Sequence, residues 1–548
     1  MALRFFGLPT AHTTWSLDED AVSVDRDTAP SGVPQATING IGDGSVLGTK
    51  GKPLVADSTE YGRMELAVSS AAQSSGTWTV TANTILSKLN VTGNVKPVYQ
   101  AGAATCITKF FDAAKVATAD YTLQVDGALT AKRFTVPAGY DNVWTLLRKW
   151  LSANELDFCY VFNTFVVYPQ RSRVIRVSDV SGDWTISIDG DGSEVKTINT
   201  YVYNRTPFTN GLVFPPHATA YVRSDKHFAP NEINAISVAA NETTETEIEL
   251  GAEVSALGQP THVLSVPMSG GVANINTTTY PNGIYTVVGQ DNKPITPAQW
   301  EAEGGSLRVE LQPNGHTAKV FVTGMNNSRL GPFRIAESDG STDHPSLYLI
   351  AASGQYVDID MIRFDTGAVH GDDSMELDNP AIDTLTKAYR AAQAAADTRI
   401  GATVTLNWSG SDPVRSEFKD FAMSWAIKAP TLGDVSDFTG SPLPAKAEAI
   451  WPAGTTMSKI DSDLQNYMTS DATRSHRRQS FGRLAGSRFY LHGFWWRVST
   501  ASWSDSGVSI TATLDQTVAD LTRRYATMDK WDQPAGISLL ELSTKGIL

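Results

Sequence analysis

The 548-residue chain has few of the residues that hold small disulfide-bonded or zinc-binding proteins together. It contains two cysteines, Cys106 and Cys159, and neither lies in a CxxC or a Cys/His spacing. Two cysteines cannot form a disulfide framework, and these spacings indicate no zinc site. Because Cys159 lies inside the apolar run from Phe158 to Phe162, we expect it to be a buried free thiol.

Charged residues and long hydrophobic runs are also scarce. Only 19% of the residues are charged, and the formal net charge is −14. This acidic balance disfavours tight general binding to nucleic acid phosphates, although it allows weak contact with passing DNA. No run of about 18 apolar residues occurs, so we expect no membrane span. The apolar run before Pro9 is too short for a signal peptide, so we expect a soluble chain made in a cytoplasm.

The familiar sequence signatures of catalysis are missing. The nine histidines are scattered, and no HExxH or GxSxG motif occurs. Gly40–Ser45 has serine where a dinucleotide loop needs glycine, and Asp189–Ser193 begins like a calcium loop but then departs from the EF-hand pattern. Glycosidase carboxylate pairs cannot be recognised in a sequence, because their separation of roughly 5–10 Å is set by the fold. We therefore predict that the protein is not an enzyme and has no catalytic, cofactor-binding or metal-binding residues.

Two acidic segments leave an alternative open. Asp358–Asp360 and His370–Asp373 could gather oxygen ligands for a metal ion, or they could form a solvated strand and loop. We favour the solvated strand and loop.

The residues that are abundant favour β-structure. Gly, Ser, Thr and Asn are frequent, and 41% hydrophobic residues suffice for buried cores. We predict a mainly β, multidomain fold with α+β modules. The expected divisions are an irregular N-terminal arm (1–60), a first β-rich part with a small α/β module (61–205), an inserted β-sandwich-like domain (206–355), a second β-rich part (356–515), and a C-terminal helix and arm (516–548).

Apolar periodicity predicts the main helices. A helix is expected near 103–117, and another near 141–153, where Val143, Leu147 and Trp150 share one face. A strand pair at 157–160 and 164–168 should follow the second helix.

A third helix is predicted after the insertion. Asn379 is the expected N-cap and Pro380 the first helical residue. The apolar stripe of this helix would comprise Ile382, Leu385, Tyr389, Ala392 and Ala396. Further on, apolar segments on either side of Asp505-Ser506-Gly507 predict a hairpin.

Two residue groups could contact other molecules. Tyr280, Tyr285 and Trp300 could form a sugar-binding face on the insertion, although core positions are favoured. A dense basic stretch could contact DNA phosphates or an acidic neighbouring subunit, or it could be solvated or paired within the chain. Its candidate residues are Arg474, Arg477, Arg478, Arg483 and Arg488.

Four segments together resemble the hub-type minor tail proteins of long-tailed bacteriophages, particularly those infecting actinobacteria. They are Gly62–Asn90 with its Ile85-Leu-Ser-Lys-Leu-Asn90 motif, the helix-plus-hairpin unit Asp141–Tyr168, the helix start Leu377–Ile382, and Gly454–Val498. Each motif is short, and their order along the chain carries the resemblance.

The resemblance implies a structural virion protein at the tail tip, or baseplate hub. Such a protein is a homotrimer that closes the tail tube, with two barrel-like β-domains per chain forming a pseudo-sixfold ring. It contacts the distal tail protein, the tape-measure protein and other minor tail proteins, and it helps to form the conduit for DNA ejection. It needs no cofactor and assembles in the cytoplasm of the host bacterium. The alternatives are a receptor- or glycan-binding tail-tip adhesin and, less favoured, a tail-associated cell-wall hydrolase.

Overall fold

The computed structural model describes the strands and helices of most of the chain. The described residues are 3–6, 14–20, 35–41, 53–58, 62–74, 77–161, 164–170, 183–189, 195–214, 221–223, 236–269, 272–335, 346–366, 373–399, 403–410, 485–486, 488–491, 494–504 and 507–514. Their strands form eight sheets, which confirms the mainly β, multidomain fold. None of these sheets closes into a barrel within the described ranges. No described helix is long and apolar enough to cross a membrane.

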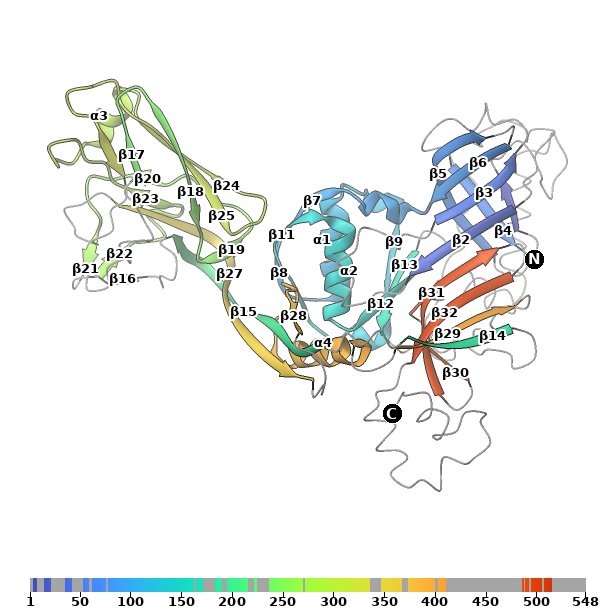
Figure 1. The fold of residues 1–548 in the computed structure, drawn as a ribbon. Helices are drawn as coiled ribbons and strands as arrows, with labels where there is room; N and C mark the ends of the chain where they lie inside the picture. The colour runs from blue at the N-terminus through green and yellow to red at the C-terminus, as the bar shows by residue number, and fades with distance from the viewer. Residues whose placement is uncertain are drawn as a thin grey trace.

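The largest sheet has 11 strands and combines residues from both ends of the chain, at the right of Figure 1. One half contains, in spatial order, β1 (Leu3–Phe6), β4 (Pro53–Ser58), β5 (Gly62–Ser74), β6 (Thr77–Asn83), β3 (Gln35–Ile41) and β2 (Thr14–Asp20). The other half contains β31 (Phe494–Ser504), β32 (Gly507–Leu514), β29 (Thr403–Gly410) and β14 (Asp183–Asp189), with β30 (Arg488–Leu491) paired to β31.

Antiparallel pairing of β2 with β31 joins the two halves, from Ser16 opposite Ser504 to Asp20 opposite Thr500. The prediction of an irregular segment over residues 1–60 was therefore wrong, because β1 to β4 lie there. These strands are short, and β1, β2 and β3 each take a partner far away along the chain, so their local periodicity is too brief to indicate strands.

The central body contains the helices that cover small sheets, in the middle of Figure 1. Its elements are η1 (Ile85–Leu89), β7 (Thr92–Val95), β8 (Val98–Ala101), α1 (Ala103–Ala113), η2 (Thr118–Asp120), β9 (Thr122–Val125), η3 (Gly127–Leu129), β10 (Phe134–Val136), β11 (Gly139–Asn142), α2 (Val143–Ala153), β12 (Leu156–Val161) and β13 (Thr164–Pro169). Helix α2 and the β12–β13 pair confirm the sequence prediction. The Asn142 side chain caps α2 by accepting a hydrogen bond from the Thr145 amide at 3.1 Å.

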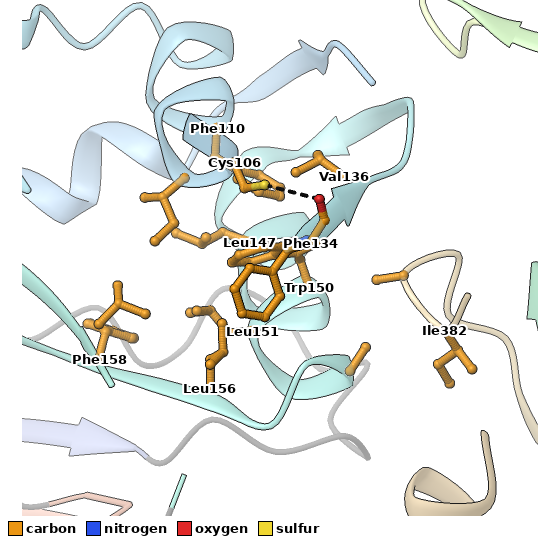
Figure 2. Close-up of a cluster of buried hydrophobic side chains, with 14 of the residues drawn as sticks. Cys106, Phe110, Phe134, Val136, Leu147, Trp150, Leu151, Leu156, Phe158 and Ile382 are labelled. Atoms are coloured by element: carbon orange, nitrogen blue, oxygen red, sulfur yellow. Dashed lines mark hydrogen bonds between the residues drawn. The ribbon is translucent and has the colours of Figure 1, made fainter. Parts of the chain in front are cut away.

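Trp150 lies at the centre of the core of this body (Figure 2). Its indole packs against Phe110 and Phe134, with ring centroids 5.8 and 5.7 Å away, and its Nε1 donates to the Thr135 carbonyl at 2.7 Å. Cys106 is also buried there as a free thiol, and burial raises its pKa to about 12. The cysteine predicted to be buried, Cys159, lies in β12, but its side chain is outside the described residues.

Helix α4 (Leu385–Arg399) begins later than predicted. Asn379 instead closes a turn, since its side chain accepts from the Ala381 amide at 3.0 Å and donates to the Lys149 carbonyl at 3.0 Å. Thr384 caps the helix through the Lys387 amide at 3.3 Å. The predicted apolar stripe was partly wrong, because Leu385 and Tyr389 are exposed. The buried face is made of alanines instead: Ala388, Ala391, Ala392, Ala395 and Ala396.

The lobe, at the left of Figure 1, is formed by residues inserted between two long strands, β15 (Val195–Phe214) and β27 (Leu347–Asp365). It contains β16 (Tyr221–Arg223), β17 (Ile236–Val238), β18 (Thr243–Glu249), β19 (Ala252–Val254), β20 (Thr261–His262), β21 (Met268–Ser269), β22 (Val272–Asn274), β23 (Gly283–Tyr285), α3 (Pro297–Ala302), β24 (Ser306–Leu311), β25 (Thr317–Thr323) and β26 (Phe333–Ile335). β15 and β27 pair antiparallel and run through the predicted boundaries near 206 and 355. Near the central body, β28 (Asp373–Leu377) pairs parallel with β15.

Candidate functional site

The residues predicted to contact other molecules have two different outcomes. Arg474, Arg477, Arg478 and Arg483 lie outside the described residues, and Arg488 begins β30 without a described side chain. The basic stretch therefore stays a prediction. No group of three or more His, Cys, Asp or Glu side chains within the described ranges is placed to hold a metal ion.

The aromatic residues of the insertion belong to the core of the lobe. Trp300 is 0% exposed and packs edge-on against Phe333, with ring centroids 5.5 Å apart. Tyr285 is buried and stacks on His262, with ring centroids 4.8 Å apart. Tyr280 is half-buried against a separate, smaller apolar cluster of the lobe. Buried rings cannot stack on a sugar, so Trp300 and Tyr285 are core residues and not a glycan-binding face.

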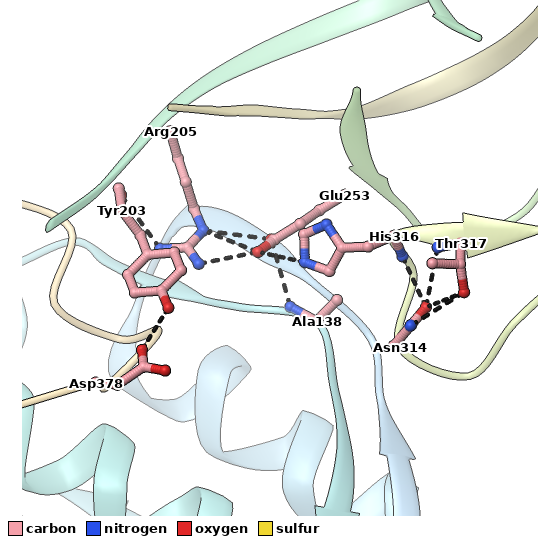
Figure 3. A network of polar contacts seen from close by, with 8 residues as sticks. All are labelled: Ala138, Tyr203, Arg205, Glu253, Asn314, His316, Thr317 and Asp378. Carbon is pink, nitrogen blue, oxygen red and sulfur yellow. Dashed lines mark hydrogen bonds and ion pairs between the residues drawn. The ribbon is translucent and has the colours of Figure 1, made fainter. Parts of the chain in front are cut away.

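A buried polar cluster lies where the lobe meets the central body (Figure 3). Arg205 of β15 and Glu253 of β19 form an ion pair with an Nη2–Oε1 distance of 2.9 Å, and each side chain is only 1% exposed. Arg205 Nε also donates to both carboxylate oxygens, at 3.2 and 3.3 Å. The fork-like guanidinium thus holds the carboxylate through several donors, an arrangement that fixes direction as well as distance.

The Glu253 carboxylate also reaches two other segments. The Ala138 amide, between β10 and β11 of the central body, donates to Oε2 at 3.4 Å. On the lobe side, Nε2 of His316, in the turn between β24 and β25, lies 3.3 Å from Oε1. One carboxylate therefore contacts β15, the central body and a turn of the lobe.

Close backbone packing accompanies these polar contacts. Gly315 has a φ of 72°, and a Cβ on it would lie 2.9 Å from the Ala138 Cβ and 3.1 Å from the Val254 carbonyl oxygen. Only glycine fits this turn, because both the left-handed backbone and the space exclude a side chain. Asn314 holds the turn by accepting hydrogen bonds from the amides of His316 and Thr317, each at 3.0 Å.

The electrostatics of the cluster favour an ionised carboxylate. Burial by itself would raise the pKa of Glu253, but the hydrogen bond from His316 and the guanidinium of Arg205 outweigh it, so the pKa is lowered. Nearby, the Tyr203 hydroxyl donates to Asp378 Oδ1, and the Arg205 guanidinium lies 5.4 Å from the centre of the Tyr203 ring. The charges of Arg205 and Glu253 are both buried and paired to each other. The cluster can therefore hold the lobe against the central body.

Sequence analysis missed this cluster. Arg205 and Glu253 are 48 residues apart, and neither belongs to a recognisable motif. The available signal is weak: Glu253 stands between two apolar residues in the short strand Ala252–Val254.

Comparisons with known proteins give no family. No protein-family model matches the chain, and no curated protein sequence does. Solved structures with a distant likeness include the prophage tail protein gp18 from Listeria monocytogenes EGD-e (6% identity, TM-score 0.35), the tail protein from Neisseria meningitidis MC58 (8%, 0.36) and the 43 kDa tail protein of prophage MuSo2 from Shewanella oneidensis (8%, 0.34). The alignments cover 96% of this chain and 100% of gp18, and 94% of this chain and 97% of each of the other two. Scores this low establish no shared fold.

The first prediction concerns the buried ion pair. Glu253→Gln leaves the Arg205 charge buried without a counter-charge, and we expect it to lower the free energy of unfolding by about 3–5 kcal/mol. Chemical denaturation of the purified chain measures this loss. The control is Glu245→Gln, which removes a surface ion pair with Lys319 and should cost about 0–1 kcal/mol. Equal losses in the two variants would contradict the assigned role of Glu253.

The second prediction concerns His262, which is buried in the lobe with neither ring nitrogen hydrogen-bonded to a described residue. Burial lowers its pKa from 6.5 to about 4. Between these values the unfolded chain binds a proton that the folded chain does not, so stability should fall as pH drops from 6.5 toward 4.

His262→Phe keeps an aromatic ring against Tyr285 and removes the titrating group. The slope of unfolding free energy against pH over this interval should become flatter in the variant. Glu253 contributes little to this slope, since its lowered pKa moves its loss of stabilisation to more acidic pH. An unchanged slope would show that His262 does not titrate as described.

Proposed function

We propose that the protein is a structural component of a bacteriophage tail tip, the central hub that closes the tail tube and helps to form the DNA-ejection conduit. The observation that carries this proposal is the composite 11-stranded sheet. Its two halves, one from residues 3–83 and one mostly from residues 403–514, lie side by side and are joined by the pairing of β2 with β31.

Two neighbouring β-units in one chain suit a trimeric ring. Three copies related by a threefold axis would place six such units around one lumen, and closed symmetry leaves no open end. In such a ring the strand edges at the ends of each sheet would be covered by the next copy, which is the usual way to protect unpaired strand edges. The sequence resemblance to hub-type minor tail proteins independently favours the same arrangement.

The proposed partners follow from this position. A hub of this kind would contact the distal tail protein, the tape-measure protein and other minor tail proteins, and DNA would pass it transiently. The acidic net charge of −14 suits a conduit wall that does not retain DNA. The chain would be assembled in the host cytoplasm and reside in the virion tail tip.

The third prediction is a threefold ring in the tail tip. Cryo-electron microscopy of tips from isolated tails should show this chain as a trimer that continues the tube lumen, with obligate interfaces above about 2,000 Å². A peptide tag inserted after Asn292, in the exposed loop before α3, would locate the lobe separately. The chain can then be fitted into the density of the tail tip without ambiguity. A chain found only in peripheral spikes or fibres would overturn the hub role and favour the adhesin.

The fourth prediction concerns chemistry. We propose that the protein works by subunit arrangement and breaks no covalent bonds. Purified chain incubated with host cell-wall material should release no soluble fragments, with a known wall hydrolase as the positive control. Release of fragments above the level of a heat-denatured sample would make the protein a hydrolase.

A further inference from the structure

Two supports hold the paired strands β15 and β27, one where they leave the central body and one where they enter the lobe (Figure 1). On the lobe side, β19 pairs with β27 at Gly354–Tyr356. On the body side, the Tyr203 amide of β15 donates to the Ile382 carbonyl at 2.8 Å, and the Tyr203 hydroxyl donates to Asp378. Tyr203 is therefore held by the central body.

Between these supports lies a short neck, which we define as the cross-strand pairs Asn204–Asp358 and Arg205–Val357. No third described strand pairs with the neck. Arg205 is held by the lobe, because its guanidinium donates three hydrogen bonds to Glu253 of β19. Ribbons of two strands twist more than wider sheets do. A change of twist can therefore concentrate at Asn204–Asp358, between the residue held by the body and the residue held by the lobe.

Outside this ribbon, the described residues of the lobe meet the central body at Ala138. The Ala138 amide donates to Glu253 Oε2 at 3.4 Å. The Gly315 turn packs on the same residue so closely that a Cβ on Gly315 would lie 2.9 Å from the Ala138 Cβ. The described apolar cores of the lobe and of the central body are separate clusters. Burial of these cores therefore does not set the angle between the two bodies.

Opening the contact at Ala138 leaves the buried ion pair intact. Glu253 keeps its hydrogen bonds from Arg205, and His316 Nε2 stays 3.3 Å from the carboxylate, because these residues move with the lobe. The Ala138 amide exchanges its long hydrogen bond for one to water. A hydrogen bond whose partners regain other partners contributes little net free energy. The contact at Ala138 can therefore be released without unfolding either body.

We propose that the lobe is a rigid body that pivots on the neck at Asn204–Asp358, and that the contact with Ala138 is a releasable lock. The lock consists of the Glu253 carboxylate and the Gly315 turn on the lobe side and Ala138 on the body side. When the lock opens, the lobe turns with its core and its buried ion pair unchanged, and it takes a second orientation. The proposal stands on the neck and the lock, and it does not depend on the role in a tail tip.

Distances between pairs of spin labels, measured by pulsed electron paramagnetic resonance, test the proposal. Labels attached to unnatural ketone side chains leave Cys106 and Cys159 unchanged. One pair, at the exposed positions Ala302 of α3 and Ala104 of α1, reports the distance between the two bodies. A second pair, at Ala302 and Glu247 of β18, reports the distance within the lobe. In the unaltered chain each pair should give one dominant distance.

Ala138→Glu should open the lock, because it places a larger side chain with a like charge against Glu253. The distance between the two bodies should then lose most of its dominant population to a second, broader range, while the distance within the lobe stays the same. The matched control is Ala128→Glu, the same substitution at an exposed position of the central body, which should change neither distance. An unchanged distance between the bodies in Ala138→Glu, or a changed distance within the lobe, would overturn the proposal.

Gly315→Ala reaches the lock from the lobe side and decides the question if Ala138→Glu does not fold. Its added methyl group meets the Ala138 Cβ, so it should shift the distance between the bodies in the same direction. Hydrogen–deuterium exchange then locates the pivot. Backbone amides of residues 204–205 and 357–358 should exchange faster than in the unaltered chain, while those of β25 in the lobe core stay protected. Faster exchange in β25, or none in the neck, would refute a pivot at Asn204–Asp358.

Discussion

The placement of the lobe depends on one buried ion pair, between Arg205 and Glu253. Apart from this cluster, the described residues join the lobe to the central body through the paired strands β15 and β27, and such a two-stranded ribbon bends and twists easily. Glu253 removes that freedom because its carboxylate contacts β15, the Ala138 backbone and His316 at once. A buried ion pair adds little net stability compared with apolar packing, but its geometry specifies direction. The cluster therefore fixes the orientation of the lobe relative to the central body, which burial of apolar area alone would not specify.

The central core depends on segments from both sides of the insertion. Its buried residues include Trp150 and Phe110 before the lobe, and Ile382 and the alanines of α4 after it. The Asn379 amide reaches the Lys149 carbonyl across this gap in sequence, and Arg390 Nη1 lies 2.7 Å from Glu155 Oε2. Alanines on α4 allow the helix to lie close to β15, where larger side chains would hold it away. The lobe has a separate core, formed by residues of β15, β27 and the segment between them.

Sequence reasoning succeeded where one element carries its own signal. Helix α2 has a capping residue and an apolar face within a dozen residues, and β31 and β32 pair antiparallel up to Ser504 opposite Gly507. Sequence reasoning failed where the role of a residue depends on a distant segment. Asn379 is the predicted helix cap, but its side chain hydrogen-bonds within a turn and to the Lys149 carbonyl of α2. Leu385 and Tyr389 were expected in the core because apolar residues at helical spacing do not reveal which face a sheet will cover. Arg205 and Glu253 could not be paired from sequence, since a buried ion pair has no periodicity.

Parts of the molecule whose contacts are local in sequence tolerate substitutions differently from parts whose contacts join distant segments. The 11-stranded sheet and the central core each need residues from both sides of the insertion, so a substitution in either must suit segments hundreds of residues apart. The core of the lobe is formed by β15, β27 and the residues between them. Among the described residues, Glu253 and the Gly315 turn contact the central body at Ala138. Its outer surface can therefore vary while this small contact is kept.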